Sequence, residues 1–174
     1  MNKWLKCWQE LKGKHPKALL YTMSALLPMT IMLVVWFFMG SYPFGNKSLM
    51  AVDFGQQYIS FFGLLKNAVL TGDLSSLTYS FTKSLGGDMI GVLGYYLMSP
   101  FNIFYIIIPF KHYGLAVFLT IWLRYGAIGL SFSHFLIKRY KGAESRMWLV
   151  PLFATAYALS GMVVSYQMNV IFYD

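Results

Sequence analysis

The sequence predicts an all-helical integral membrane protein whose chain crosses a lipid bilayer several times. Hydrophobic residues make up 57% of its 174 residues and charged residues only 11%, whereas a soluble domain carries roughly 25% charged residues. Three long stretches contain no charged residue at all: 18–46, 89–110 and 147–173. A bilayer crossing needs about 20 mostly apolar residues, and each stretch is long enough. A soluble fold of this size could not cover so much apolar surface with so few charges.

Basic residues gather in two short clusters beside apolar stretches and account for most of the net charge of +8. They are Lys3, Lys6, Lys12, Lys14 and Lys17 in the first cluster and Lys138, Arg139, Lys141 and Arg146 in the second. Such clusters are typical of cytoplasmic loops next to membrane-spanning helices. Neither falls on a predicted strand or groove of the kind that binds nucleic acid. We therefore expect a multi-pass protein of the cell membrane with a cytoplasmic N-terminus, surrounded by lipid, and no nucleic-acid partner.

The pattern of charge and hydropathy divides the chain into six segments. They are a cytoplasmic amphipathic lead-in at 1–17, a first transmembrane helix at 18–39, an extracytoplasmic loop at 41–88, a re-entrant or juxtamembrane segment at 89–110, and two further transmembrane helices at 113–137 and 147–165. The single cysteine, Cys7, lies in the cytoplasmic lead-in and predicts no disulfide. Three crossings make a poor bundle alone, so we expect the N-terminal membrane portion of a longer protein.

The loop at 41–88 carries three lysines and three aspartates, and this lack of net charge places it outside the cell. Apolar side chains recur within it at a 3.6-residue period, which predicts a helix lying on the membrane surface. These side chains are Phe54, Tyr58, Phe61, Phe62, Leu65 and Val69. The turn sequence Thr71-Gly72-Asp73 predicts the end of that helix.

The segment 89–110 raises a question of parity. If both basic clusters face the cytoplasm, an even number of crossings must separate them, yet three apolar stretches do. Glycine, proline and asparagine interrupt 89–110, and irregular backbone at membrane depth needs protein or a watery cavity around it. We therefore favour a segment that does not cross. In the alternative, Lys111 and His112 form a tight cytoplasmic turn and 138–146 lies outside.

Asp53 and Gln57 are the first candidates for chemistry. On a helix these two residues, four apart, share one face, with Ser60 close by. A carboxylate just outside the bilayer could take a proton from a hydroxyl, or hold a divalent cation beside a phosphate. The alternative is structural, because aspartate is also a preferred N-cap residue that satisfies free amides at the start of a helix.

A second group of candidates follows further along the chain. Glycines at 86 and 87 precede Asp88 and favour a tight turn that lets a ligand approach the backbone closely. Tyr95 and Tyr96 could stack on a sugar, or belong to the aromatic belt found at membrane interfaces. Asn102 follows soon after, in the sequence Ser-Pro-Phe-Asn.

Arg124 interrupts the 113–137 stretch near its middle. A charge at the centre of a membrane helix costs about 2.5–3.5 kcal/mol on insertion scales, so it should face water or a partner. It could neutralise a lipid-linked phosphate, a role suited to a guanidinium group, or pair with a carboxylate elsewhere in the bundle. His112 and His134 have no second ligand at metal-binding spacing, and no metal site is predicted.

The ordered motifs carry a family resemblance. Asp-x-x-x-Gln-Tyr at 53–58, Ser-Leu-Gly-Gly-Asp at 84–88 and Tyr-Tyr-Leu-x-Ser-Pro-Phe-Asn at 95–102 together resemble the N-terminal region of YfhO-type bacterial membrane proteins. The resemblance runs over about residues 15–174, and members of that family are several times longer. The family is similar to GT-C glycosyltransferases, which implies a GT-C-like helical bundle in a bacterial cell membrane.

The resemblance also implies an activity. By it, the full-length protein is a membrane glycosyltransferase that moves a sugar from a polyprenyl-phosphate donor to an envelope polymer acceptor, such as lipoteichoic acid of Gram-positive bacteria. The resemblance makes Asp53 the catalytic base and assigns no certain cofactor beyond an optional divalent cation. It makes substrate-binding residues of Gln57, Tyr58, Asp88, Tyr95, Tyr96, Asn102 and Arg124. The 174 residues alone are expected to be inactive. A transporter or permease subunit, or a non-enzymatic envelope-assembly protein, is the alternative.

Overall fold

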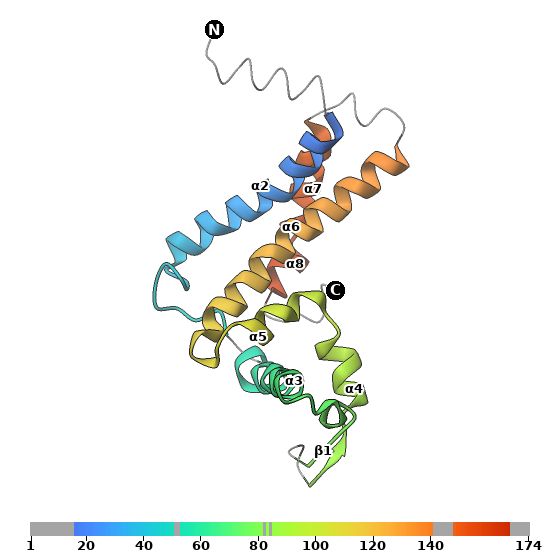
Figure 1. Ribbon diagram of the computed structural model, residues 1–174. Coiled ribbons are helices and arrows are strands. Elements are labelled where there is room, and N and C mark those ends of the chain that lie inside the picture. The colour runs from blue at the N-terminus through green and yellow to red at the C-terminus, as the bar shows by residue number, and fades with distance from the viewer. Residues whose placement is uncertain (1–15, 51–52, 82, 84, 141–147, 168–174) are drawn as a thin grey trace. The chain divides into compact units, whose positions relative to one another are not determined.

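The computed structural model describes residues 16–50, 53–81, 83, 85–140 and 148–167 (Figure 1). Most of the predicted lead-in with Cys7 lies outside these residues, as do Lys141 and Arg146 of the second basic cluster. The described residues divide into two compact units, the first formed by Met1–Val35 and Trp122–Val164 and the second by Trp36–Ile121 and Ser165–Asp174. Each unit is described by itself.

Two helices are long and apolar enough to cross a bilayer. Helix α2 spans Pro16–Met39 and helix α6 spans Tyr113–Arg139. The candidate spans built on them, Lys17–Met39 and Phe110–Arg139, have 23 and 30 residues, or roughly 35 and 45 Å at 1.5 Å per residue. The hydrocarbon core of a bilayer is about 30 Å thick. The predicted all-helical membrane class is therefore confirmed. That these two helices are the crossings expected at 18–39 and 113–137 stays a prediction.

The predicted third crossing at 147–165 is a shorter and interrupted apolar element. Helix α7 spans Leu149–Ala158 and helix α8 spans Gly161–Ser165. Together they cover Leu149–Ser165, an apolar helical element shorter than the two candidate spans. At 1.5 Å per residue this is roughly 25 Å, a little less than the hydrocarbon core. That this element crosses the membrane stays a prediction.

In the first unit, α2 packs closely against the later half of α6. The Trp122 indole donates to the Met29 carbonyl at 3.1 Å, and the Tyr21 hydroxyl lies 3.1 Å from Nδ1 of His134. Between these contacts, Gly129 lies against the Ser24 backbone carbonyl, so a side chain at 129 would collide with it. Close approach through small residues is the usual way in which membrane helices associate.

In the second unit, helix α3 (Ile59–Thr71) packs against helix α5 (Ile103–Ile107). The rings of Phe62 and Tyr105 stack with centroids 4.0 Å apart and an interplanar angle of 5°, and both side chains are buried. Lys66 is also buried, and its ammonium donates to the Ile108 carbonyl at 2.6 Å. The segment after α5 is thereby fixed to α3.

Short elements complete the second unit. They are the π-helical turns η1 (Phe54–Tyr58) and η3 (Leu93–Leu97), the 3₁₀ turns η2 (Leu74–Leu77), η4 (Pro100–Asn102) and η5 (Phe110–His112), helix α4 (Ile90–Val92), and strands β1 (Tyr79–Ser80) and β2 (Gly87–Asp88). The two strands form an antiparallel hairpin in which Tyr79 pairs with Asp88. Helix α3 ends at Thr71 because Gly72 adopts a left-handed conformation, with φ of 74°, which glycine tolerates best.

The segment predicted at 89–110 is bent sharply. Its halves, Ile90–Leu97 and Pro100–Ile107, meet at 89°. Each half has eight residues and is about 12 Å long, so neither half could cross a bilayer alone. The pair is either one broken span or a re-entrant loop, and the re-entrant form favoured by the parity argument stays a prediction.

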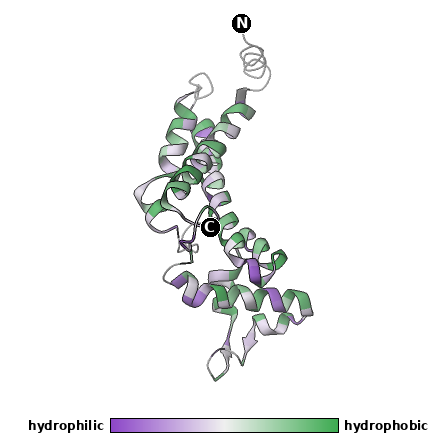
Figure 2. Cartoon of the chain, turned by 90° about the vertical axis from the view of Figure 1, so that its left-hand side faces the viewer, coloured by the Kyte–Doolittle hydropathy of each residue, from purple (hydrophilic) through white to green (hydrophobic). Residues whose placement is uncertain are grey.

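Hydropathy differs between the long helices and the short elements. Figure 2 shows hydrophobic residues running along the long helices, with hydrophilic residues more frequent among the short elements that follow α2 in the chain. Several large apolar side chains of α2 are exposed, namely Leu26, Leu27, Ile31, Val34 and Val35. Exposed aliphatic side chains along a membrane-length helix are what contact with lipid requires.

Candidate functional site

Asp53 stands exposed immediately before the π-helical turn η1. Its backbone is already helical, with φ of −62° and ψ of −27°, and its side chain makes no capping hydrogen bond. An N-cap residue normally has extended backbone and accepts a hydrogen bond from an amide two or three residues on. The structural alternative for Asp53 therefore lacks its defining contact, and the carboxylate is left facing solvent.

The π-helical turn changes which residues share a side with Asp53. A π-turn closes hydrogen bonds between residues five apart and so takes more residues per turn than an α-helix. Gln57 and Tyr58, four and five positions after Asp53, consequently both come round towards its side. Gln57 is exposed and Tyr58 is buried. Single π-turns inside helices are rare and frequently occur at functional sites.

Tyr58 brings the motif at 53–58 into contact with the motif at 95–102. Its ring centroid lies 5.1 Å from that of Tyr96, which belongs to the other π-helical turn, η3. Tyr96 also contacts Tyr95 at 4.8 Å and Phe61 at 5.1 Å. Tyr96 is half-buried, whereas Tyr95 is 57% exposed. We call Asp53, Gln57, Tyr58, Tyr95 and Tyr96 the aspartate–tyrosine cluster.

The surroundings of Tyr58 raise the pKa of its phenol. Burial raises the pKa of Tyr58 above its ordinary value, and the neighbouring Tyr96, Asp53 and Tyr95 raise it further. Burial disfavours the phenolate because a charged group loses its hydration, and nearby negative groups repel it. Like any tyrosine at neutral pH, Tyr58 keeps its hydroxyl proton, and its raised pKa extends the range over which the phenol can act as a hydrogen-bond donor.

Asn102 is buried and fixes the backbone of the cluster at Tyr96. It is 2% exposed, and its side-chain amide donates to the Tyr96 carbonyl at 2.9 Å. The bend before it is set by Ser99, whose hydroxyl accepts from the Phe101 amide, and by Pro100 at the first position of η4. In this structure Asn102 holds the backbone of Tyr96, and the substrate contact predicted for it stays a prediction.

Asp88 lies at the end of strand β2 and Arg124 within helix α6. Asp88 is exposed at the end of β2, where one carboxylate oxygen accepts from the Ile90 amide at 3.0 Å and its carbonyl accepts from the Lys83 ammonium at 2.6 Å. Arg124 is 3% exposed and belongs to the first unit. The substrate-binding roles of both residues stay predictions.

Few side chains that could bind a metal ion lie close to one another in the described residues. Within the described ranges, no three His, Cys, Asp or Glu side chains come together in a way that could hold a metal ion. A cation at Asp53 would therefore need further ligands from substrate phosphate or water, as magnesium often takes.

Two features of the site were missed from the sequence. Phe61 was predicted only as part of an apolar stripe, yet it contacts the Tyr96 ring. Lys66 lies within the same stripe and is buried, with its ammonium 5.3 Å from the Phe110 ring centroid. A lysine at a core position of an amphipathic helix is a recognisable signal, because buried lysines nearly always have a partner.

The motifs that form this cluster lie within a region matched by a known protein family. The family model described as Bacterial membrane protein YfhO matches residues 24–174. The chain belongs to this family. The match covers most of the chain, including all the motifs, and YfhO membership agrees with the two membrane-length helices. Comparison with curated proteins and with solved structures gave no match.

Proposed function

We propose that this YfhO-family chain is the N-terminal part of a membrane glycosyltransferase acting on the extracytoplasmic side. The enzyme moves a sugar from a polyprenyl-phosphate donor to a cell-envelope acceptor such as lipoteichoic acid. One observation carries the proposal. Two motif segments some forty residues apart meet through Tyr58 and Tyr96 beside Asp53, whose carboxylate makes no capping hydrogen bond.

Asp53 acts as the general base of the transfer. Its carboxylate takes the proton of the acceptor hydroxyl while the hydroxyl oxygen forms a bond to the anomeric carbon of the sugar. The bond between that carbon and the phosphate oxygen breaks, and its electron pair leaves with the polyprenyl phosphate. A base must be within hydrogen-bond reach of the proton it takes, and an exposed carboxylate allows that approach.

The neighbouring residues orient the reacting groups. The protonated Tyr58 donates a hydrogen bond to the Asp53 carboxylate or to the bound sugar, and Gln57 offers a second polar contact on the same side. Tyr95 is the ring of the cluster most open to a ligand, and it stacks on the sugar. Arg124 neutralises the leaving phosphate. A divalent cation, held by Asp53 together with substrate phosphate and water, would supply further positive charge there.

The replacement Asp53→Asn in the full-length protein tests this proposal. General-base catalysis contributes about 10²–10⁴-fold to rate, so transfer from a polyprenyl-phosphate-linked sugar should fall by at least 100-fold while expression and membrane insertion stay normal. Gln56→Ala, an exposed residue of the same turn, is the matched control and should retain activity. Transfer within a few-fold of the parent protein in Asp53→Asn would exclude Asp53 as the base.

The location of Asp53 is testable on its own. With Cys7 replaced by serine, Asp53→Cys should react with a membrane-impermeant maleimide added outside intact cells. Labelling only after the cytoplasmic face is opened would overturn the extracytoplasmic assignment, and with it the cytoplasmic N-terminus. Ser75→Cys and Ser145→Cys should label from opposite sides, which would show that the number of crossings between them is odd.

A transporter subunit is the second candidate, and the 89° bend between Ile90–Leu97 and Pro100–Ile107 favours it. Discontinuous helices at membrane depth are typical of the binding sites of secondary transporters. The transporter proposal predicts solute accumulation in vesicles that is lost in Asp53→Asn with envelope glycosylation unchanged. The transferase proposal predicts the opposite pair of results.

A further inference from the structure

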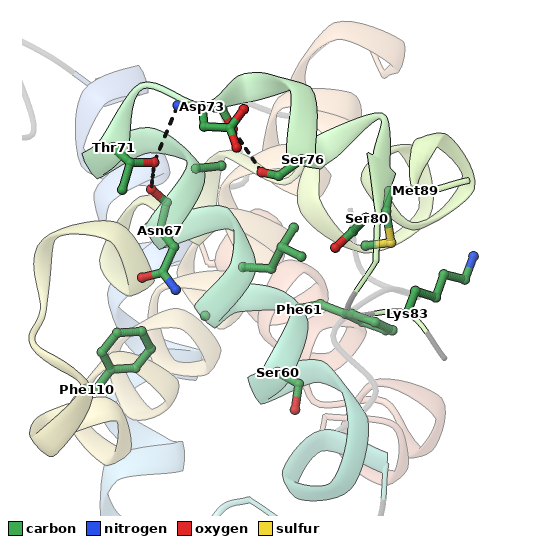
Figure 3. A pocket seen from close by; sticks show the side chains of 13 residues that line it. Ser60, Phe61, Asn67, Thr71, Asp73, Ser76, Ser80, Lys83, Met89 and Phe110 are labelled. Carbon is green, nitrogen blue, oxygen red and sulfur yellow. Dashed lines mark hydrogen bonds between the residues drawn. The ribbon is translucent and has the colours of Figure 1, made fainter. Parts of the chain in front are cut away.

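A groove of about 570 Å³ runs along one face of α3, separate from the residues given a role above (Figure 3). Its floor is made by positions that recur three and four residues apart on the helix, which places them on a single stripe. They are Ser60, Gly63, Leu64, Asn67, Ala68 and Thr71. The groove belongs entirely to the second unit.

The two sides of the groove come from segments distant in sequence from the floor. Figure 3 shows Phe110 beside Asn67 on one side, with Ser80, Met89 and Lys83 on the other. Gly63 keeps the floor open, because a Cβ there would lie 3.2 Å from the Phe110 ring.

The lining mixes apolar surface with polar groups that have capacity left for a ligand. The side-chain amide of Asn67 and the hydroxyl of Ser60 make no hydrogen bond to the described residues, and both side chains are exposed. Asp73 accepts from the Ser75 hydroxyl through one carboxylate oxygen, which leaves its other oxygen available. Pockets that bind small molecules are commonly apolar with a few placed polar groups.

The charges of the lining indicate a ligand without net charge. Asp73 is the one carboxylate and Lys83 the one ammonium among the described lining residues. Lys83 already donates to the Asp88 carbonyl at 2.6 Å. Arginine, the residue best suited to bind phosphate in a fork, does not occur among these lining residues.

We propose that this groove binds a neutral polyhydroxylated unit, a sugar ring or a polyol, of the acceptor. An amide offers both donors and acceptors and a carboxylate offers acceptors, which matches neighbouring hydroxyl groups. The rings of Phe61 and Phe110 provide apolar surface for the carbon–hydrogen face of such a unit. An acyl chain would leave the polar groups of Asn67 and Asp73 without partners, which costs binding energy.

The groove adjoins the aspartate–tyrosine cluster through Phe61. This residue lines the groove and contacts the Tyr96 ring at 5.1 Å. A unit bound in the groove is thereby placed beside the cluster that contains Asp53. The assignment of the bound unit to the acceptor rests on the proposed function, whereas the binding of a neutral sugar or polyol does not.

Binding is tested with the full-length protein in lipid nanodiscs by saturation-transfer NMR. The probes are methyl β-glucoside, methyl β-galactoside, glycerol and inorganic phosphate, and a glycosyl diacylglycerol in the disc distinguishes a lipid-borne sugar from a free one. Asn67→Leu should weaken binding of the best neutral probe about tenfold, the loss expected for one or two hydrogen bonds. Asn46→Leu, an exposed asparagine of the same unit outside the groove, should leave it unchanged.

Each result has a defined meaning. Equal weakening by Asn46→Leu and Asn67→Leu, failure of every neutral probe to bind, or tighter binding of phosphate than of any neutral probe would overturn the proposal. Transfer kinetics separate it from the proposed function. Asn67→Leu should raise the KM for acceptor with little change in kcat, and Asp53→Asn should abolish transfer yet leave probe binding intact. Loss of binding in Asn67→Leu with full transfer in Asp53→Asn would keep the groove and exclude Asp53 as the base of the transfer.

Discussion

Three glycine-to-alanine replacements in the first unit should have effects graded by what each new methyl group meets. At Gly129 it would collide with the backbone carbonyl of Ser24, at Gly126 it would lie 2.5 Å from the Sδ atom of Met29, and at Gly161 nothing lies within 4 Å. A backbone carbonyl in a helix cannot turn aside, whereas the end of a methionine side chain is flexible. The order of destabilisation should therefore be Gly129, then Gly126, then Gly161.

The magnitudes follow from two opposed terms. Alanine in place of glycine within a helix interior is worth about 0.8–1 kcal/mol in helix propensity. This gain applies in full to Gly126 and Gly129 inside α6, and only in part to Gly161, the first residue of α8. Overpacking a close contact costs typically 1–3 kcal/mol, occasionally more, and the backbone collision at Gly129 calls for the upper part of that range. The expected net change is a loss of about 1–2 kcal/mol at Gly129, roughly zero at Gly126, and a small gain at Gly161.

Thermal denaturation in detergent, followed by the monodisperse fraction in size-exclusion chromatography, measures this order. The three variants share the same chemical change, so that detergent and expression effects cancel in the comparison. A Gly129→Ala protein as stable as Gly161→Ala would refute the close approach of α2 to α6 at Ser24.

Two further predictions concern the second unit. Phe62→Ala should lower the free energy of unfolding by about 3–5 kcal/mol, the range for removing a buried phenylalanine, because it removes the ring that stacks on Tyr105. Phe81→Ala, at a residue 80% exposed, is the control and should change stability little. Equal effects of the two replacements in a denaturation assay would contradict the burial of Phe62 against Tyr105. Because the folded-state pKa of Tyr58 is raised above 10.0, its contribution to stability should be lost as pH rises from that value through the raised one. In an ultraviolet titration of phenol ionisation against pH, Tyr58→Phe should therefore lose one tyrosine that ionises above the usual pH range. Loss of a tyrosine that ionises at the usual pH would contradict the burial of Tyr58.

Hydropathy and charge predicted the membrane class and the long helices because those depend on composition over twenty residues or more. Helix α3 ends at Thr71, where the turn sequence predicted an end, because glycine at 72 takes a left-handed conformation that other residues resist. These features are local, so a single sequence carries enough information for them.

The arrangement around Asp53 could not be predicted in the same way. The spacing argument assumed α-helical periodicity from Asp53 onward, whereas residues Phe54–Tyr58 form a π-turn. That turn accompanies the burial of both Phe54 and Tyr58, whose rings contact each other at 5.7 Å. It depends on packing against segments far along the chain. The meeting of Tyr58 with Tyr96 likewise requires the intervening helix and hairpin, and no local pattern encodes it.

The two adjacent tyrosines at 95 and 96 show why residue type alone left their role open. A tyrosine of the aromatic belt needs only to lie at the membrane interface, and both position 95 and position 96 would meet that requirement. In the structure Tyr96 is held on three sides, by Tyr58, Phe61 and Tyr95, and its carbonyl is fixed by Asn102. That degree of fixation is more than a belt requires, and it leaves Tyr95 projecting from a rigid support. Under the proposed function Tyr95 is the ring that contacts the sugar, and a rigid support beneath that ring would lower the conformational entropy lost on binding.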